Sequence, residues 1–204
     1  MDYVWNYIKE RFIPDGFAFT MDAFCREYDA EDDLTKVDIA FEIFGKSERE
    51  FLEVENAITS SEMSGEDAYL ALKRAKMKQR LTSHFFAISL YHIVEKVLKA
   101  KLASVDCNAW TESLNFEALK KRLKEHGYDI QNFSNYDSIN KLRMVANAAK
   151  HDLETDKQLD AIHTSFKFRE ELPYLGSFFH DNNIIPACWA FIRELYAATA
   201  SQKC

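Results

Sequence analysis

Residues 66–103 read EDAYLALKRAKMKQRLTSHFFAISLYHIVEKVLKAKLA and form the longest periodic stretch of this chain. Apolar residues recur in it at alternating spacings of four and three, which is the pattern of an α-helix with one buried face. The expected buried seam runs through Met77, Leu81, His84, Ile88, Tyr91, Glu95, Leu98 and Leu102. Such a helix is about 55 Å long at 1.5 Å per residue, so we expect it to be the central helix of a bundle.

The composition of the chain favours an all-α fold. Its 204 residues include only 5 Gly and 3 Pro, too few for the many tight turns of a β-sandwich or barrel. Hydrophobic residues make up 47% of the chain and aromatic residues 14%, which excludes a disordered chain. No apolar run approaches the ~20 residues that a membrane-spanning helix needs, and the first residues do not resemble a signal peptide. We therefore expect a globular protein that has no membrane partner.

The four cysteines are isolated from one another in the sequence. They lie at Cys25, Cys107, Cys188 and Cys204, with no C-x-x-C pair. This spacing predicts neither a zinc knuckle nor a disulfide framework. Because free thiols are typical of reducing compartments, we expect a cytoplasmic protein without a structural metal.

Residues 1–63 are expected to form an acidic N-terminal extension made of short helices. Helical spacing predicts these helices near residues 4–12, 21–28, 34–44 and 48–58. Gly45 is expected to end the third helix, and Ser47 with Glu50 to cap the start of the fourth. A Ser-rich tract then separates the extension from a second unit, residues 64–204.

The second unit is expected to be a bundle of four main helices. They are predicted at residues 66–103, 115–126, 134–153 and 186–200. Residues 104–113 are expected to form a loop, and residues 155–183 an irregular link with a short helix near 156–163. The aromatic residues of the link are expected to cover the core; they are Phe166, Phe168, Tyr174, Phe178 and Phe179. The predicted fold is thus an all-α four-helix bundle preceded by a helical extension.

Charge is distributed unevenly along the chain, whose net charge is −7. Residues 1–70 contain 18 acidic and 6 basic residues, whereas residues 71–151 contain 15 basic and 7 acidic residues. A local basic surface can hold a polyanion even when the whole chain is acidic. A solvated helix face explains the same pattern, and the charge distribution leaves both interpretations open.

Residues 139–152, INKLRMVANAAKHD, place five polar side chains on one face of the helix predicted at 134–153. At 100° per residue, these side chains share an arc of about 100°. We call them the polar stripe, which consists of Asn140, Arg143, Asn147, Lys150 and His151. The rest of the helix is largely apolar, so we expect the polar stripe to line a cleft or an interface.

The residue types of the polar stripe suit a phosphate ligand. Arg143 and Lys150 would neutralise phosphoryl oxygens, and Asn147 would orient a hydroxyl group or a base edge. Histidine is the residue type suited to proton transfer near neutral pH, and His151 together with an Arg is sufficient in principle to activate a ribose 2′-hydroxyl against its own phosphodiester. This chemistry needs neither a metal nor a cofactor. In the alternative interpretation, His151 only caps the C-terminal end of the helix and Lys150 is solvated.

The run LRMVANAAKHD, residues 142–152, resembles the signature helix of the HEPN superfamily (higher eukaryotes and prokaryotes nucleotide-binding domains). The run HFFAISLYHIVEKVLKAKL, residues 84–102, is similar to the long helix that precedes it in such domains. The resemblance implies a HEPN-like four-helix bundle over about residues 66–200, often dimeric, of the kind found in bacterial toxin–antitoxin and phage-defence systems. Active members are metal-independent endoribonucleases whose composite site forms across the dimer.

The match to the catalytic pattern of this superfamily is incomplete. Asn147 and His151 match the polar residue and the His of the pattern, but Ala146 stands where the Arg is expected. The nearest Arg is Arg143, one turn earlier on the same helix face. Either Arg143 substitutes for the missing Arg, or the domain has lost nuclease activity.

Two main functional hypotheses follow from the resemblance. In the first, the protein is an RNA-directed, metal-independent endoribonuclease and a homodimer. His151, Arg143 and Asn147 would be its catalytic residues, and Lys150 and Asn140 would bind phosphate. In the second, the protein is a catalytically inactive module that binds RNA or a nucleotide, or scaffolds a protein partner such as an antitoxin. A purely structural helical interaction protein is a third reading, and no DNA partner is expected.

Other motifs in the chain carry less chemistry. His92 and Glu95 form an H-x-x-E pair, but the other predicted helices supply no matching carboxylate–histidine pair, so we expect a buried hydrogen-bonded pair and no metal site. Glu95 is alternatively expected to pair with Arg143 or Lys150. The chain has no glycine-rich phosphate loop and no G-x-S-x-G elbow, which disfavours nucleotide hydrolases and α/β-hydrolases.

Overall fold

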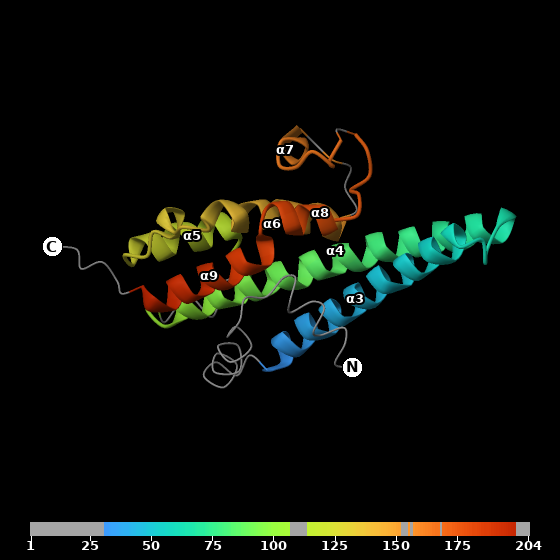
Figure 1. Ribbon diagram of the computed structural model, residues 1–204. Coiled ribbons are helices and arrows are strands. Elements are labelled where there is room, and N and C mark those ends of the chain that lie inside the picture. Colours follow the sequence, from blue (N-terminus) through green and yellow to red (C-terminus); the bar gives the residue numbers. More distant parts are fainter. Residues whose placement is uncertain (1–30, 107–113, 152–154, 156, 168, 199–204) are drawn as a thin grey trace.

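Helix α4 (Gly65–Ala103) is the longest element of the computed structural model, and several of the other helices pack against it (Figure 1). The structure describes residues 31–106, 114–151, 155, 157–167 and 169–198. Within these residues the other elements are α3 (Glu31–Thr59), α5 (Phe116–Glu125), the 3₁₀ helix η2 (Ile130–Asn132), α6 (Tyr136–His151), α7 (Lys157–Asp160), α8 (Gly176–Asp181) and α9 (Ile184–Ala197). All of these elements are helical, which confirms the predicted all-α class.

A tight turn joins α3 to the start of α4, and the two helices form a hairpin. Ser64, the N-cap residue, has an extended backbone, and Gly65 has a φ of +67°, a left-handed conformation that side chains other than Gly rarely adopt. Glu66 and Asp67 then place negative charge at the positive end of the helix dipole. The Ser-rich tract predicted as a separator is thus a turn between two packed helices.

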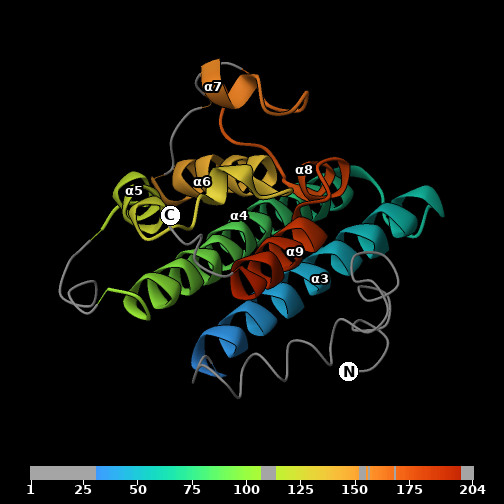
Figure 2. The ribbon, with the colours of Figure 1, turned by 90° about the vertical axis from the view of Figure 1, so that its left-hand side faces the viewer.

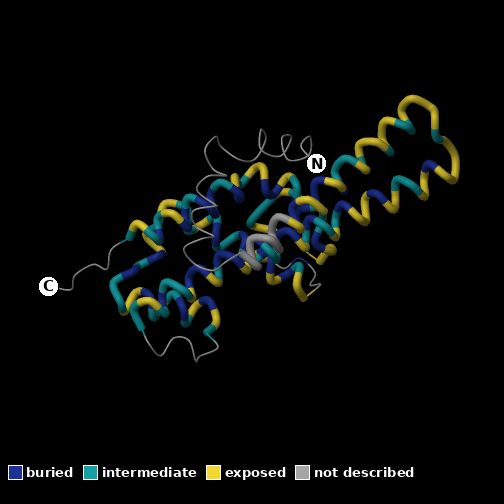
Figure 3. Tube along the Cα trace, turned by 90° about the horizontal axis from the view of Figure 1, so that it is seen from below, coloured by how far each residue is buried: buried dark blue, intermediate teal, exposed yellow. Residues whose placement is uncertain are grey.

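Helix α3 runs antiparallel to α4 and packs along its N-terminal half. The rings of Phe44 and Phe86 stack with centroids 5.6 Å apart, and the hydroxyl groups of Ser47 and Thr82 lie 2.6 Å apart. Lys78 forms an ion pair with Glu50 closer to the tip. The far end of this hairpin extends beyond the rest of the molecule (Figures 1 and 3).

The predicted break between two helices at Gly45 is wrong. α3 is continuous from Glu31 to Thr59, and Gly45 lies buried inside it. Ser47 does not cap a helix; its hydroxyl donates to the carbonyl oxygen of Phe44 within α3. Packing against α4 along this whole length outweighs the local preference of Gly for a helix end, because most helix stability in proteins comes from tertiary packing.

The predicted seam of α4 is also wrong in the N-terminal half of the helix. Met77 and Leu81 were expected to be buried as part of the seam, but both are exposed, as is Phe85. The face that packs against α3 is instead made of smaller and polar residues, with Phe86 at its end; it includes Ala68, Ala75, Gln79 and Ser83. The small side chains allow α3 to approach closely and to insert its own aromatic rings.

The C-terminal half of α4 is the axis of a four-helix bundle with α5, α6 and α9 (Figure 2). α6 packs against both α4 and α9, and α9 also contacts α4. The core is continuous from the hairpin into this bundle; its largest fully buried side chains include Phe86, Phe178, Phe191, Leu98 and Leu119. All four predicted main helices are therefore present.

The link before α8 closes the side of the bundle. Phe166, Phe178 and Phe179 are buried, as expected for a cover over the core. α8 itself was not predicted, and Phe168 lies outside the described residues. The link also reaches the hairpin, where the Tyr174 hydroxyl donates to Glu48 at 2.6 Å and His84 Nε2 lies 2.9 Å from the carbonyl oxygen of Pro173.

Candidate functional site

Helix α6 carries the polar stripe on the face opposite its core contacts. Ile139, Leu142, Val145, Ala146 and Ala148 are its buried residues. Asn147, Lys150 and His151 are exposed, whereas Asn140 and Arg143 are half-buried. The polar stripe is therefore half-buried at Asn140 and Arg143. It is exposed at the C-terminal end of α6.

Arg143 is held in the half-buried part by two groups. Its Nε and one terminal nitrogen both donate to the side-chain oxygen of Asn140, at 3.1 and 3.0 Å. The guanidinium also lies over the ring of Phe116 in α5, 5.2 Å from its centroid, which is a cation–π contact. Asn140 thus positions Arg143, and the phosphate contact expected for Asn140 stays a prediction.

The surroundings of Arg143 include the phenol of Tyr91 on α4. Burial raises the pKa of Tyr91, the carboxylate of Glu95 raises it further, and the charge of Arg143 opposes both effects. Glu95 does not form the ion pair expected with Arg143 or Lys150 in the described structure; its carboxylate binds Lys99 at 2.9 Å. Among the residues that the structure describes, Arg143 therefore has no carboxylate ion-pair partner beside its Asn140 contact.

The last turn of α6 places three side chains together without internal partners. Asn147, Lys150 and His151 are at positions i, i+3 and i+4, so they share one face. Within the part of the chain that the structure describes, none of the three side chains has a hydrogen bond or an ion pair. They are also at the negative end of the helix dipole, which favours the two cationic residue types there.

The structure explains why an Arg at position 146 would not belong to the polar stripe. The Ala146 side chain is 3% exposed and lies in the core between α6 and its neighbours. A guanidinium at this position would have to be buried, which is costly without a partner. The positive charges of this face come instead from Arg143 and Lys150.

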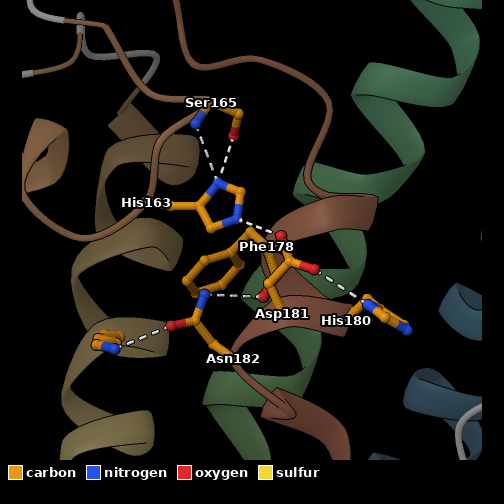
Figure 4. Close-up of polar contacts among 7 residues, drawn as sticks. His163, Ser165, Phe178, His180, Asp181 and Asn182 are labelled. Carbon is orange, nitrogen blue, oxygen red and sulfur yellow. Dashed lines mark hydrogen bonds and ion pairs between the residues drawn. The ribbon is translucent and has the colours of Figure 1, made fainter.

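A second polar cluster, which the sequence analysis did not find, joins the link to α8 (Figure 4). His163 Nδ1 accepts from the backbone N–H of Ser165 at 3.2 Å and lies 2.6 Å from its hydroxyl oxygen. His163 Nε2 lies 3.0 Å from a carboxylate oxygen of Asp181, whose other oxygen lies 3.0 Å from His180 Nδ1. Hydrogen bonds from His180 and His163 lower the pKa of Asp181.

This cluster anchors the link to the bundle. The side chain of His163 is 7% exposed and packs against the rings of Phe166 and Phe178. Lys141 of α6 donates to the side-chain oxygen of Asn182, the residue after Asp181, at 2.9 Å. Because the backbone N–H of Ser165 already occupies the Nδ1 lone pair, the geometry favours positioning of the loop over activation of the hydroxyl. His163 and Asp181 are 18 positions apart in the sequence, and no motif connects them.

Further predictions concerned the His92–Glu95 pair, metal sites, membrane-spanning helices and the cysteines. His92 is exposed and forms no buried pair with Glu95, so that expectation is wrong. Among the described residues no three His, Cys, Asp or Glu side chains are grouped closely enough to hold a metal ion. None of the described helices combines the length and the apolar character of a membrane-spanning segment. Of the four cysteines, Cys188 is buried with a free thiol, and the other three lie outside the described residues.

Comparisons with family models, with curated proteins and with solved structures gave no match to this chain.

Proposed function

We propose that this protein is an RNA-directed, HEPN-like helical module, and that the polar stripe of α6 is its RNA-binding and cleavage site. The observation that carries the proposal is the open last turn of α6. Asn147, Lys150 and His151 are exposed there and have no side-chain partner in the described part of the chain, one turn after the fixed cation Arg143. Polar groups that are not used within the fold are available to a ligand.

The chemistry would be intramolecular transfer of the RNA phosphodiester. His151 would take the proton of the ribose 2′-hydroxyl, whose oxygen then attacks the adjacent phosphorus atom. The bond from phosphorus to the 5′-oxygen breaks, which leaves a 2′,3′-cyclic phosphate and a 5′-hydroxyl. Arg143 and Lys150 would stabilise the negative charge on the phosphoryl oxygens, and Asn147 would orient the ribose.

A homodimer would supply the second proton transfer. The leaving 5′-oxygen needs an acid while His151 of the same copy is acting as the base. Two copies that face one another across the polar stripe would place a second His151 at the same phosphodiester. We propose this arrangement as the active assembly, in a toxin–antitoxin or phage-defence setting as the HEPN resemblance implies.

The nuclease reaction can be tested directly with purified protein and mixed RNA in excess chelator. We expect wild type to produce ends with cyclic phosphate, and His151→Ala to abolish this product. His92→Ala is the matched control, since His92 is also an exposed histidine but lies on α4 and is not part of the polar stripe. Cleavage that persists in His151→Ala would contradict the assigned role of His151.

A second candidate function is favoured by the position of Arg143. Two of its nitrogens are committed to Asn140, and Ala146 provides no replacement cation. The same face would then bind RNA without cleaving it. Wild type that fails to cleave RNA at high protein concentration would select this candidate.

Binding of labelled single-stranded RNA distinguishes the silent module from a purely structural protein. We expect Lys150→Ala to weaken binding and to reduce the slope of log affinity against log salt by about 0.7, the value for one lost phosphate contact. Lys167→Ala, which removes another exposed lysine, should leave both quantities unchanged. Equal effects of the two substitutions would show that the charge, and not the polar stripe, binds RNA.

A further inference from the structure

One flank of the α3–α4 hairpin exposes five large apolar side chains. We call this surface the flank patch; it consists of Ile39, Ile43, Met77, Leu81 and Phe85. Their exposed fractions are 49%, 38%, 55%, 54% and 48%. Single exposed apolar residues are ordinary on protein surfaces, but a contiguous group of this kind marks an interaction site.

The antiparallel arrangement of the two helices makes the patch contiguous. Phe44 and Phe86 stack on one another across the hairpin. In an antiparallel pair, the residue that precedes each member of a facing pair lies on the same flank, so Ile43 and Phe85 are neighbours. The other members continue the patch along the two helices in steps of four residues, about one turn each: Ile39, Leu81 and Met77.

The exposed apolar residues of α4 have the spacing of a seam between helices. Leu70 and Met77 are seven residues apart, and Leu81 and Ile88 repeat this spacing after an offset of four. Such a heptad pattern is typical of a helix that packs against another helix along its length. Because Met77 and Leu81 are more than half exposed, no helix among the described residues covers this part of the seam. A helix from outside the single chain is therefore expected there.

The two helices that border the patch have opposite charge. α3 contains nine acidic and three basic residues, whereas residues 65–86 of α4 contain five basic and two acidic residues. A two-fold axis parallel to the hairpin sets α4 of one copy opposite α3 of a second copy, so that opposite charges meet on both sides of the axis. A two-fold axis that crosses the hairpin would instead set α4 against α4, with like charges opposed. The charge distribution thus fits a second copy in one orientation.

The length and register of the patch fit the same orientation. Lys78 pairs with Glu50, so Met77 lies near the level of Phe51 in α3. From the level of Ile39 to that of Phe51, the patch is about 18 Å long at 1.5 Å per residue. Rotation about an axis parallel to the helices leaves every level unchanged. The patch of a second copy therefore covers the same 18 Å, about level for level.

Two unpaired charges lie beside the patch, toward the tip of the hairpin. Arg74 on α4 and Glu53 on α3 are exposed, and neither has an ion-pair partner among the described residues. Arg74 precedes Met77 by three residues and Glu53 follows Glu50 by three, so helical periodicity directs both toward the flank. The register of the Glu50–Lys78 pair places them at nearly the same level. In the two-fold arrangement, each Arg74 is therefore level with the partner's Glu53.

We propose that the flank patch is an interface between two copies of this chain, related by a two-fold axis parallel to the hairpin. α3 and α4 of both copies then form an antiparallel four-helix bundle in which acidic and basic helices alternate. Phe85 of each copy packs against the partner's Ile43, and Arg74 pairs with the partner's Glu53. This interface is separate from the polar stripe, which lies on α6, and it is independent of any action on RNA.

Sedimentation velocity of the full chain over a range of concentrations tests the interface. Leu81→Glu combined with Phe85→Glu would bury two charges at the apolar centre, so we expect this variant to form an assembly of half the wild-type mass. The comparison with wild type makes the result independent of pairing through α6, which would double both masses alike. Equal masses for wild type and variant would overturn the proposal.

A matched control introduces the same charges elsewhere on the hairpin. Leu52→Glu combined with Tyr69→Glu replaces exposed apolar residues that are not in the flank patch, and we expect this variant to keep the wild-type mass. Circular dichroism verifies that both variants retain their helix content. A halved mass in the control as well would overturn the assignment of the interface to the flank patch.

An exchange of charges between copies tests the orientation. Arg74→Glu or Glu53→Arg alone sets like charges opposite one another at both two-fold contacts, and each should raise the dissociation constant of this interface about tenfold. An equimolar mixture of the two variants has opposite charges at both contacts and should recover the wild-type constant. An effect within one chain would not be restored by mixing. A mixture that associates no better than the separate variants would overturn the placement of α4 against the partner's α3.

Discussion

Arg143 shows how a single side chain is given a position before any ligand arrives. Its contacts with Asn140 and Phe116 are made by neighbours on α6 and α5, so little side-chain entropy remains to be lost on binding. The sequence was sufficient to put Asn140 and Arg143 on one face, because helical periodicity fixes that. It was not sufficient to predict the hydrogen bond between them, or that Glu95 pairs with Lys99 and not with Arg143. Both depend on the side-chain rotamers that the packing of α4 and α5 allows.

Two adjacent phenylalanines of α4 separate core packing from surface exposure. Phe86 is 2% exposed and packs against Phe41, Phe44 and Phe179, whereas Phe85 is 48% exposed. We expect Phe86→Ala to lower the free energy of unfolding by about 3–5 kcal/mol, the usual cost of truncating a buried Phe. Phe85→Ala should cost clearly less.

Urea denaturation with a common m-value measures both changes. Each variant removes the same atoms from neighbouring positions of one helix, so helix propensity cancels in the comparison. Equal losses would mean that α4 is rotated relative to the orientation described above.

At the scale of elements, local signals predicted helix ends well where a cap decides them. The helix predicted at residues 115–126 is α5, where Asn115 is the N-cap and accepts from the Ala118 amide at 2.9 Å, and Gly127 has a φ of +91° just after the helix. The same kind of signal failed at Gly45, where the partner helix α4 keeps α3 continuous. The periodicity of α4 likewise showed that the helix is amphipathic but not which arc meets α3, since that arc is set by residues far away in the sequence.

The hydrogen bonds that join the link to Asp181 of α8 make the stability of the folded state change with pH in the acid range. Asp181 accepts hydrogen bonds from His180 and His163, which lower its pKa below the ordinary value of 3.8. The folded state therefore favours the carboxylate, and the stabilisation is present above pH 3.8 and lost as the pH falls through the lowered pKa. We expect Asp181→Asn to reduce the melting temperature slightly at pH 6, with the difference from wild type vanishing in stronger acid.

Thermal melts of both proteins between pH 2 and pH 6 check this expectation. Asp160→Asn is the control, because Asp160 is an exposed carboxylate on α7 without a side-chain partner in the described structure. A difference between Asp181→Asn and wild type that stays constant down to the lowest pH would show that the carboxylate charge does not contribute.

At the scale of the whole molecule, the boundary predicted between residues 63 and 64 coincides with the tip of the hairpin. Composition and charge change there, but packing does not stop, because α3 is seated on α4 on the C-terminal side of this boundary. A domain boundary inferred from charge cannot detect a hydrophobic core to which residues on both sides of that boundary contribute. The buried cluster runs from Ala40 and Phe41 in α3 to Leu195 in α9 without interruption.

This shared core predicts that hairpin and bundle unfold together. Phe44 is 4% exposed in α3 and contacts Phe86, Tyr174 and Phe179, which belong to the hairpin partner, the link and α8. We expect Phe44→Ala to lower one common melting transition by about 6–20 °C, from a loss of about 3–5 kcal/mol in a chain of this length. Circular dichroism follows all helices, and tryptophan fluorescence includes Trp189 in the bundle. Coincident midpoints by the two probes would place both predicted units in one cooperative core. An early loss of helix signal at unchanged fluorescence would instead mean that α3 melts alone, and that the shared contacts are too weak to couple the two parts.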